Sequence, residues 1–264
     1  MQTCLRNILD LALQKGQVSV TWLGQAGYVI KACPDIYLVI DPYLSDICEQ
    51  NLGRQFKRLM PAVLTVEELN QLPLAAYLIT HHHEDHLDPP IIQALQGGDY
   101  PFLAPPDSVS ILRGLNVASD RCLPLAQDAR VVRKGFTVTG TFADHGELAP
   151  DAVGIIIETA GKVIYHMGDT CLNEAELQKL RDKWPSIDLL IVPINGKYGN
   201  MNEAEAIKAI GILQPKHVLP CHFWMLPANS GGDVAWFCEH AAAACPDVEV
   251  RLLTQGDRFI LESF

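Results

Sequence analysis

The segment His81-His82-His83-Glu84-Asp85-His86 constrains this chain more than any other part of its sequence. It holds four of the nine histidines and two acids within six positions, in the spacing His-x-His-x-Asp-His. Imidazole nitrogens and carboxylate oxygens are the ligands that zinc and similar divalent metals prefer. Four donors are too many for one tetrahedral site that keeps a position open. The segment therefore predicts two adjacent metal ions that activate a water molecule for hydrolysis.

The flanking sequence places this cluster on a loop between a strand and a helix. Residues 75–80 are apolar and predict a short buried strand that leads into His81. Asp88 suits the N-cap of a helix that starts at Pro89. Side chains on such a loop can converge on a metal, whereas an expression tag would lie at a terminus and would not alternate with acids.

Length and composition indicate one folded domain over residues 1–264, with 48% hydrophobic residues to form its core. No apolar run reaches the ~18 residues of a membrane span, and residues 1–15 lack the pattern of a secretory signal. The eight cysteines are scattered without a C-x-x-C pair. Such usage is typical of reduced thiols, so we expect a cytoplasmic protein that has no membrane partner.

The charge of the chain bears on its partners. Twenty basic and thirty-one acidic residues give a formal net charge of −11 at pH 7. Nucleic-acid binding requires a positive surface, so the balance argues against a nucleic-acid partner and favours a small-molecule substrate. The oligomeric state stays open, and the sequence is compatible with a homo-oligomer.

Strand patterns and helix patterns alternate along the chain, which favours a layered α/β architecture. Predicted strands cover residues 17–23, 28–31, 36–40, 135–141, 152–158 and 162–167. Predicted helices cover residues 65–71, 173–183, 202–213 and 233–244. The pairs Asn173 with Glu176 and Asn202 with Glu205 have the spacing of a capping box at a helix start.

Metal-ligand types recur where apolar strands stop, namely at Asp41, His81, Asp169 and His222. Functional sites in layered α/β proteins gather at one end of the strands, so we expect these four side chains to meet. Each residue alone has an ordinary alternative as a turn residue, a helix cap or a buried histidine. Cys221, beside His222, is interpreted as a small buried hydrophobic residue.

Together these motifs resemble the metallo-β-lactamase superfamily, through the His81–His86 segment, Gly168-Asp169-Thr170 and His222. Four further stretches are similar to its L-ascorbate-6-phosphate lactonase-like branch: residues 22–27, Asp41-Pro42-Tyr43, Leu87-Asp88 and residues 201–206. The resemblance covers the chain from about residue 18 onward. It implies an αββα sandwich in which two mixed sheets lie face to face with helices outside.

The resemblance also implies a ligand set for two divalent metal ions, Zn²⁺ or Mn²⁺, with Fe²⁺ as an alternative. One ion would be held by His81, His83 and His145, the second by Asp85, His86 and His222, and Asp169 would bridge them. Asp85 would in addition orient the nucleophile or carry its proton. Asp41 is expected to accept the second ring N–H of a ligand histidine.

Two positions depart from related families. Leu87 follows His86, where glyoxalase- and lactamase-type relatives carry glycine, and His83 stands where flavo-diiron relatives carry glutamate. The second departure disfavours an iron redox role. His82 has no family role and is expected to point away from the metals, because side chains alternate along an extended chain. His166 could support a ligand, act as a catalytic acid for the leaving group, or fill a strand position.

A small basic patch in this acidic chain suggests the charge of the substrate. Arg54, Lys57 and Arg58 follow the Asp41 strand, and we expect one or more of them to bind a phosphate or carboxylate. Lys197 and Tyr198, on the loop after residues 191–194, are weaker candidates for the same role. Ordinary solvated basic side chains are the alternative.

The sequence therefore favours a metal-dependent hydrolase that acts on a small anionic metabolite. The substrate would be a lactone or an ester, with or without a phosphate group. The alternative within hydrolases is a phosphodiesterase or nuclease. From another class, a non-catalytic metal or ligand sensor would keep the fold, although the intact ligand set argues against it. A diiron redox protein is a third option.

Overall fold

The computed structural model describes residues 2–32, 34–223 and 231–262, which form two β-sheets and the helices around them. The first sheet contains β1 (Val18–Gly24), β2 (Gly27–Ala32), β3 (Ile36–Ile40), β4 (Leu74–Leu78), β5 (Phe102–Ala104), β6 (Cys122–Pro124) and β14 (Arg258–Leu261). The second contains β7 (Arg130–Arg133), β8 (Phe136–Phe142), β9 (Val153–Thr159), β10 (Lys162–His166), β11 (Leu189–Pro193), β12 (His217–Cys221) and β13 (Glu249–Val250).

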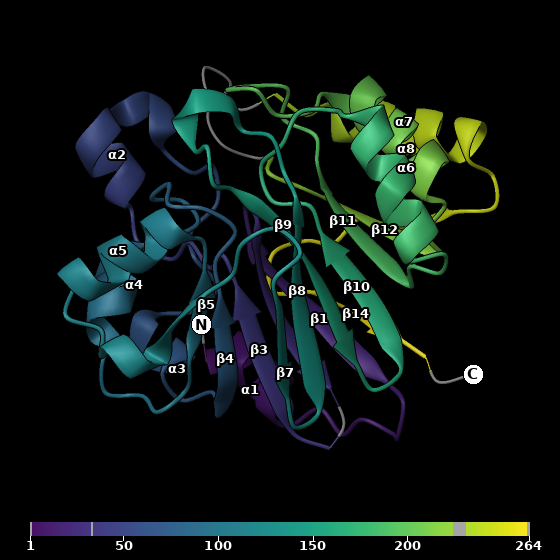
Figure 1. Cartoon of the computed structure of the whole chain (residues 1–264). Coiled ribbons are helices and arrows are strands. Elements are labelled where there is room, and N and C mark those ends of the chain that lie inside the picture. Colours follow the sequence, from purple (N-terminus) through teal and green to yellow (C-terminus); the bar gives the residue numbers. More distant parts are fainter. Residues whose placement is uncertain (1, 33, 224–230, 263–264) are drawn as a thin grey trace.

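Helices lie on the outer faces of both sheets (Figure 1). On the side of the first sheet are α1 (Gln2–Leu9), α2 (Ile47–Leu52), α3 (Val66–Leu69), α4 (Pro89–Ala94) and α5 (Pro106–Gly114). On the side of the second are α6 (Glu174–Lys183), α7 (Glu203–Leu213) and α8 (Val234–Ala244). Among the described residues, short 3-10 turns connect elements at η1 (Arg54–Phe56), η2 (Ser119–Arg121) and η3 (Gly146–Leu148). This arrangement confirms the predicted αββα sandwich.

The alternation of side chains along the strands separates two apolar layers. In β3, Leu38 and Ile40 belong to the cluster that packs between the sheets, whereas Tyr37 and Val39 belong to the cluster under the outer helices. Both faces of this strand are therefore buried, which explains its uninterrupted apolar sequence.

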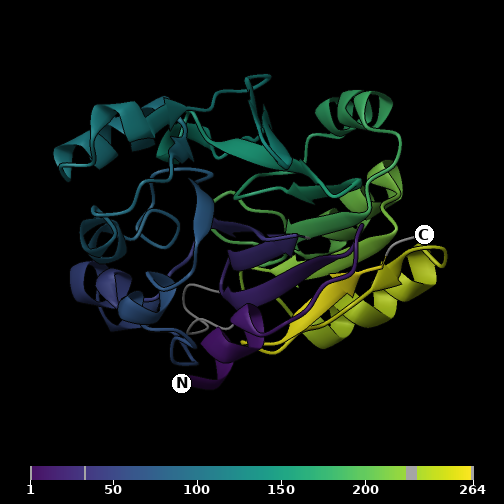
Figure 2. The ribbon, with the colours of Figure 1, turned by 90° about the horizontal axis from the view of Figure 1, so that it is seen from below.

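The two sheets share one pairing pattern. In the first sheet the pairs from β14 to β3 are antiparallel and those from β3 to β6 are parallel. In the second sheet the pairs from β7 to β10 are antiparallel and those from β10 to β13 are parallel. Figure 2 shows the terminal strand β14 beside β1. Loops that follow parallel strands leave at the carboxyl ends, where side chains can meet.

Most predicted elements occur within one or two residues of their expected bounds. The strands β5, β6 and β13 were not predicted because two or three residues are too short to show a period. Asn202 and Glu205 form the predicted reciprocal capping box, and Asn173 accepts a hydrogen bond from the backbone N–H of Glu176. None of the helices within the described ranges is long and apolar enough to span a bilayer.

Asp88 takes the predicted N-cap position of α4, and Pro89 is the first residue of that helix, but the Asp88 carboxylate makes no capping hydrogen bond. Instead it accepts hydrogen bonds from the backbone N–H groups of Leu44 and Ser45 and from the Ser45 hydroxyl. Asp88 therefore ties the segment after β3 to the loop that carries the histidine cluster.

Candidate metal centre

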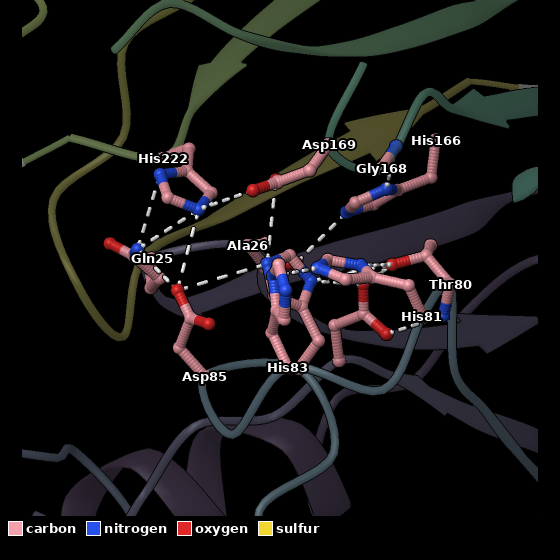
Figure 3. A network of polar contacts seen from close by, with 12 residues as sticks. Gln25, Ala26, Thr80, His81, His83, Asp85, His166, Gly168, Asp169 and His222 are labelled. Atoms are coloured by element: carbon pink, nitrogen blue, oxygen red, sulfur yellow. Dashed lines mark hydrogen bonds and ion pairs between the residues drawn. The ribbon is translucent and has the colours of Figure 1, made fainter. Parts of the chain in front are cut away.

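Seven predicted ligands lie together at one edge of the two sheets. His81, His83, Asp85 and His86 follow β4 in the first sheet. His145 follows β8, Asp169 follows β10 and His222 follows β12 in the second sheet. Because both sheets contribute, donors of the first sheet face donors of the second. Figure 3 shows Asp85 from the first sheet opposite Asp169 and His222 from the second. The apolar strands thus end at a concentrated polar site.

Three histidines form what we call the imidazole group: His81, His83 and His145. One donor atom from each lies within 4.8 Å of the others. His83 Nδ1 is 2.9 Å from His81 Nε2 and 3.3 Å from His145 Nε2. Three nitrogens around one point match the ligand set of a divalent transition metal.

Asp85, His86 and His222 form a second convergence, which we call the mixed group. Their donor atoms also lie within 4.8 Å of one another. His222 Nε2 is 3.4 Å from Asp85 Oδ2, and His86 Nε2 is 3.8 Å from the same oxygen. One carboxylate and two imidazoles are again a set suited to a divalent metal.

Asp169 faces histidines of both groups. Its Oδ1 is 3.4 Å from His86 Nε2, and its Oδ2 is 3.1 Å from His222 Nε2 and 3.9 Å from His145 Nε2. His86 Nε2 and Asp169 Oδ1 are both buried without a hydrogen-bond partner. Buried polar atoms are rarely left in this state, and a cation between them would satisfy both. The residues therefore fit a metal centre.

The two groups differ in charge. Burial lowers the pKa of His145 to about 4, and burial also lowers the pKa of His81 and His83. Burial alone would lower the pKa of His222, but the Asp169 carboxylate raises it to about 9. The pKa of His86 is likewise raised, against burial, by Asp169 and Asp85. The imidazole group is neutral at pH 7, whereas the mixed group holds protons that a metal must displace.

Asp41 occupies the predicted supporting position behind His86. His86 Nδ1 donates to Asp41 Oδ2 at 2.8 Å, and Thr80 donates to the same carboxylate through its backbone N–H and its hydroxyl. The Asp41 side chain is fully buried. Its hydrogen bond fixes the tautomer of His86, so that Nε2 is directed at the mixed group.

Sequence analysis missed two amide side chains that contact the ligands. Gln25 Nε2 donates to Asp85 Oδ2 at 3.1 Å and lies 3.2 Å from both ring nitrogens of His222 (Figure 3). Asn200 Nδ2 donates to Asp169 Oδ2 at 2.7 Å. Gln25 lies within residues 22–27, one of the stretches that resemble the lactonase-like branch. That stretch indicated a family motif but not the contacts of the Gln25 side chain. These amides hold the carboxylates of Asp85 and Asp169 in place.

Backbone strain collects around the centre. Gln25, Asp41, Tyr198 and His222 are non-glycine residues with φ between 44° and 60°. The backbone N–H of His222 donates to the carbonyl of Gln25, so two of these residues hold one another. Such conformations cost about 1–3 kcal/mol each and persist where the surrounding structure enforces them, often at functional sites.

His166 lies behind the centre and not at its surface. Its Nε2 donates to the carbonyl of Ala26 at 2.9 Å, and its Nδ1 accepts from the backbone N–H of Gly168 at 3.0 Å. The side chain is fully buried and burial lowers its pKa. Both ring nitrogens are thus used by backbone groups, which gives His166 a structural position without access to a substrate. Cys221 is buried, as expected.

The basic residues proposed to bind substrate are not brought to the centre. A cavity of about 380 Å³ opens over the ligands, and Arg54, Lys57, Arg58 and Lys197 are not among its described lining residues. The Arg58 guanidinium donates to the carbonyls of Tyr43 and Leu44, pairs with Asp46 and stacks on the Tyr43 ring. Its role is to hold the segment after β3. His82, expected to point away, belongs to neither ligand group but lines the cavity.

Comparison with known proteins agrees with this geometry. A model of the β-lactamase superfamily domain matches residues 37–223, well over half of the chain. The chain therefore belongs to the β-lactamase superfamily. It is an enzyme of the metal-dependent hydrolase class within the metallo-β-lactamase fold.

Similar proteins carry the same class name. A UPF0173 metal-dependent hydrolase of Carboxydothermus hydrogenoformans is 26% identical over 252 residues, covering 92% of this chain and 100% of the relative. One of Anaeromyxobacter dehalogenans is 29% identical over 262 residues, covering 92% of this chain and 86% of the relative. The solved structure of Igni18, a metallo hydrolase of Ignicoccus hospitalis, has a TM-score of 0.76 at 22% identity, covering 94% and 100% of the two chains. The structural similarity shows the fold.

Proposed function

We propose that this protein hydrolyses an ester or lactone bond in a small molecule with the help of two divalent cations, Zn²⁺ or Mn²⁺. The imidazole group and the mixed group would each hold one cation, and Asp169 would join them. The observation that supports this most is the convergence of seven donor residues from both sheets, five of which line the floor of one cavity. The complete donor set favours catalysis over a sensor role.

Bound divalent cations lower the pKa of a water molecule toward neutrality and polarise the oxygen of the bond under attack. The residues of the chain itself orient the attacking water. Burial alone would raise the pKa of Asp85, but His86 and His222 hold it well below its usual range. Asp85 is therefore ionised at neutral pH and lines the cavity, where it can accept a hydrogen bond from the attacking water and orient it. The Gln25 amide fixes its orientation.

The lining of the cavity bears on the charge of the substrate. The described part of the cavity wall has no lysine or arginine, and its ligand carboxylates are already matched to the metal positions. We therefore propose that the ester or lactone carries no negative charge. A phosphodiester serves as the contrasting substrate in the test.

The test compares two acid-to-amide variants in protein reloaded with Zn²⁺ or Mn²⁺ after chelation. Asp85→Asn removes the charged acceptor that orients the attacking water, so kcat for p-nitrophenyl acetate or γ-butyrolactone should fall about 10²-fold. Glu147→Gln changes an exposed acid two residues from His145 and should leave kcat within about threefold. Equal effects of both variants would contradict the role of Asp85. Turnover of bis(p-nitrophenyl) phosphate with neither ester nor lactone hydrolysed would contradict the proposed substrate.

A further inference from the structure

The cavity above the ligands has two different parts. Its floor is polar and consists of ligand residues from both groups. Its wall is largely apolar and contains Cys48 and four large side chains, Leu52, Phe56, Leu148 and Tyr198, beside the polar residues His82 and Glu84. The volume of about 380 Å³ lies within the range of roughly 300–1,000 Å³ that small-molecule sites have. We call these four large side chains the apolar wall.

The apolar wall is assembled from three segments that are far apart in sequence. Leu52 ends α2 and Phe56 ends η1, Leu148 ends η3, and Tyr198 lies in the loop between β11 and α7. The Phe56 and Tyr198 rings stack with centroids 6.3 Å apart and planes inclined by 22°. The fold thus brings two aromatic rings and two leucines together at the opening of the cavity. Each of the four side chains comes from a different helix, turn or loop.

Exposure distinguishes this wall from an ordinary core. Leu52, Leu148 and Tyr198 are each 50% exposed. Only four other large apolar residues in the described chain are exposed, and none of them lines this cavity. Apolar side chains that stay exposed around a concave site commonly mark a ligand surface.

Charged groups near the mouth do not offer an alternative partner. Glu84 accepts a hydrogen bond from Asn51 at 2.6 Å, and the nearby Arg58 guanidinium is engaged with backbone carbonyls and Asp46. A substrate anion would meet Glu84 and Asp85 on its way to the floor without a basic side chain in the described lining. An uncharged apolar group would meet four matching side chains.

We infer that the substrate carries an uncharged apolar group, of about the size of one aromatic ring, beside the bond that is cleaved. The group would lie against Leu148 and beside the stacked pair of Phe56 and Tyr198, while the scissile bond lies over the ligand residues. This inference rests on the proposed function, because it takes the floor as the place of reaction.

Three hydroxamic acids test the wall through binding to the metal-loaded protein, measured by isothermal titration calorimetry. They share one metal-binding group and differ in the attached substituent: acetohydroxamic acid, phenylacetohydroxamic acid and succinic monohydroxamic acid. The phenyl compound should bind at least about tenfold more tightly than the methyl compound, as expected for an added apolar group in an apolar pocket. The carboxylate of the succinic compound should give no gain.

Variants localise the preference. Leu148→Ser and Tyr198→Ala should each reduce the phenyl-to-methyl affinity ratio several-fold, because the phenyl group contacts the apolar wall over a larger area than the methyl group does. Leu252→Ser is the matched control, because Leu252 is 47% exposed and lies outside the cavity, and it should change neither affinity.

The outcomes separate the two proposals. Equal binding of the methyl and phenyl compounds, or tightest binding of the succinic compound, overturns the apolar substrate and leaves the hydrolase intact. A phenyl preference that depends on Leu148 and Tyr198, together with no hydrolysis of any ester or lactone, supports the wall and contradicts the proposed function. Failure of all three compounds to bind contradicts both.

Discussion

The imidazole group and the mixed group lie side by side but present opposite electrostatic states to an incoming cation. Burial keeps the three histidines of the first neutral at pH 7. In the second, carboxylates hold protons on His86 and His222. A cation can therefore enter the imidazole group without competition, whereas it must displace protons from the mixed group. One centre thus combines a site that is ready for metal with a site whose metal affinity depends on pH.

The groups also share a structural property. Each combines residues that follow β4 in the first sheet with one histidine from the second sheet, His145 or His222. Metal binding to either group therefore links the two sheets. Because a metal that binds only the folded chain stabilises it, both sites should contribute to thermal stability.

The largest expected effect comes from removing one ligand of each group. His81→Ala and His86→Ala should each lower kcat for the best ester substrate at least about 10³-fold, more than the roughly 10–100-fold that follows loss of an outer partner. The measurement is steady-state hydrolysis with saturating metal, beside circular dichroism to confirm folding. The exposed His240→Ala is the control. Retained activity in either ligand variant would show that its group is dispensable.

The pH dependence of metal affinity sharpens the comparison. The folded-state pKa of His222, about 9, is above its ordinary value, so the proton is present below pH 9 and opposes metal. Zn²⁺ affinity of the mixed group should rise about tenfold per pH unit between pH 6 and 8 for each proton displaced. Affinity of the imidazole group should be nearly flat above about pH 5, because the pKa of His145 is about 4.

This prediction is checked by competition with a chromophoric chelator. His145→Ala leaves the mixed group, and His222→Ala leaves the imidazole group. Equal pH slopes in the two variants would remove the proposed difference between them.

Asp41 should affect one group only. Asp41→Asn weakens the hydrogen bond that orients His86, so Zn²⁺ affinity of the mixed group should fall about 10–100-fold. The imidazole group should keep its affinity. The same chelator competition measures both sites, and Asp35→Asn, an exposed acid before β3, is the control. A parallel loss at both groups would mean that Asp41 acts through general stability.

The smallest effect is expected at Gln25. Gln25→Ala removes the amide that holds Asp85 and contacts His222, so kcat should fall about 3–10-fold while metal content stays constant. Gln178→Ala on the exposed face of α6 serves as a control. Loss of metal in Gln25→Ala would instead assign the amide to metal retention, and an unchanged kcat would contradict a positioning role.

The sequence predicted the ligands better than the surroundings of the site. Asp41, His81, Asp169 and His222 could be found because a polar donor directly follows an apolar strand, and such strand ends meet. His145 could be predicted only from the family resemblance, because it lies in a loop after β8 and does not directly follow an apolar strand. Gln25 and Asn200 were missed because amides are common surface residues, and only the fold brings residue 25 to residues 85 and 222.

For the residues that would bind substrate, the sequence prediction and the structure disagree. Clustered basic residues in sequence suggested an anion site, but Arg58 uses its guanidinium on backbone carbonyls, and the apolar wall is built from residues 52, 56, 148 and 198. No local pattern joins these four positions. Their association depends on how loops from both sheets meet above the ligands, which is set by tertiary packing.

The central claim, a centre of two metals joined by Asp169, is tested most directly by metal content. Protein purified without added metal, wild type beside Asp169→Ala, is measured by inductively coupled plasma mass spectrometry. Our account predicts close to two ions per wild-type chain and a clear fall in the variant, because Asp169 faces histidines of both groups. One ion or none in the wild type, unchanged in Asp169→Ala, would contradict it.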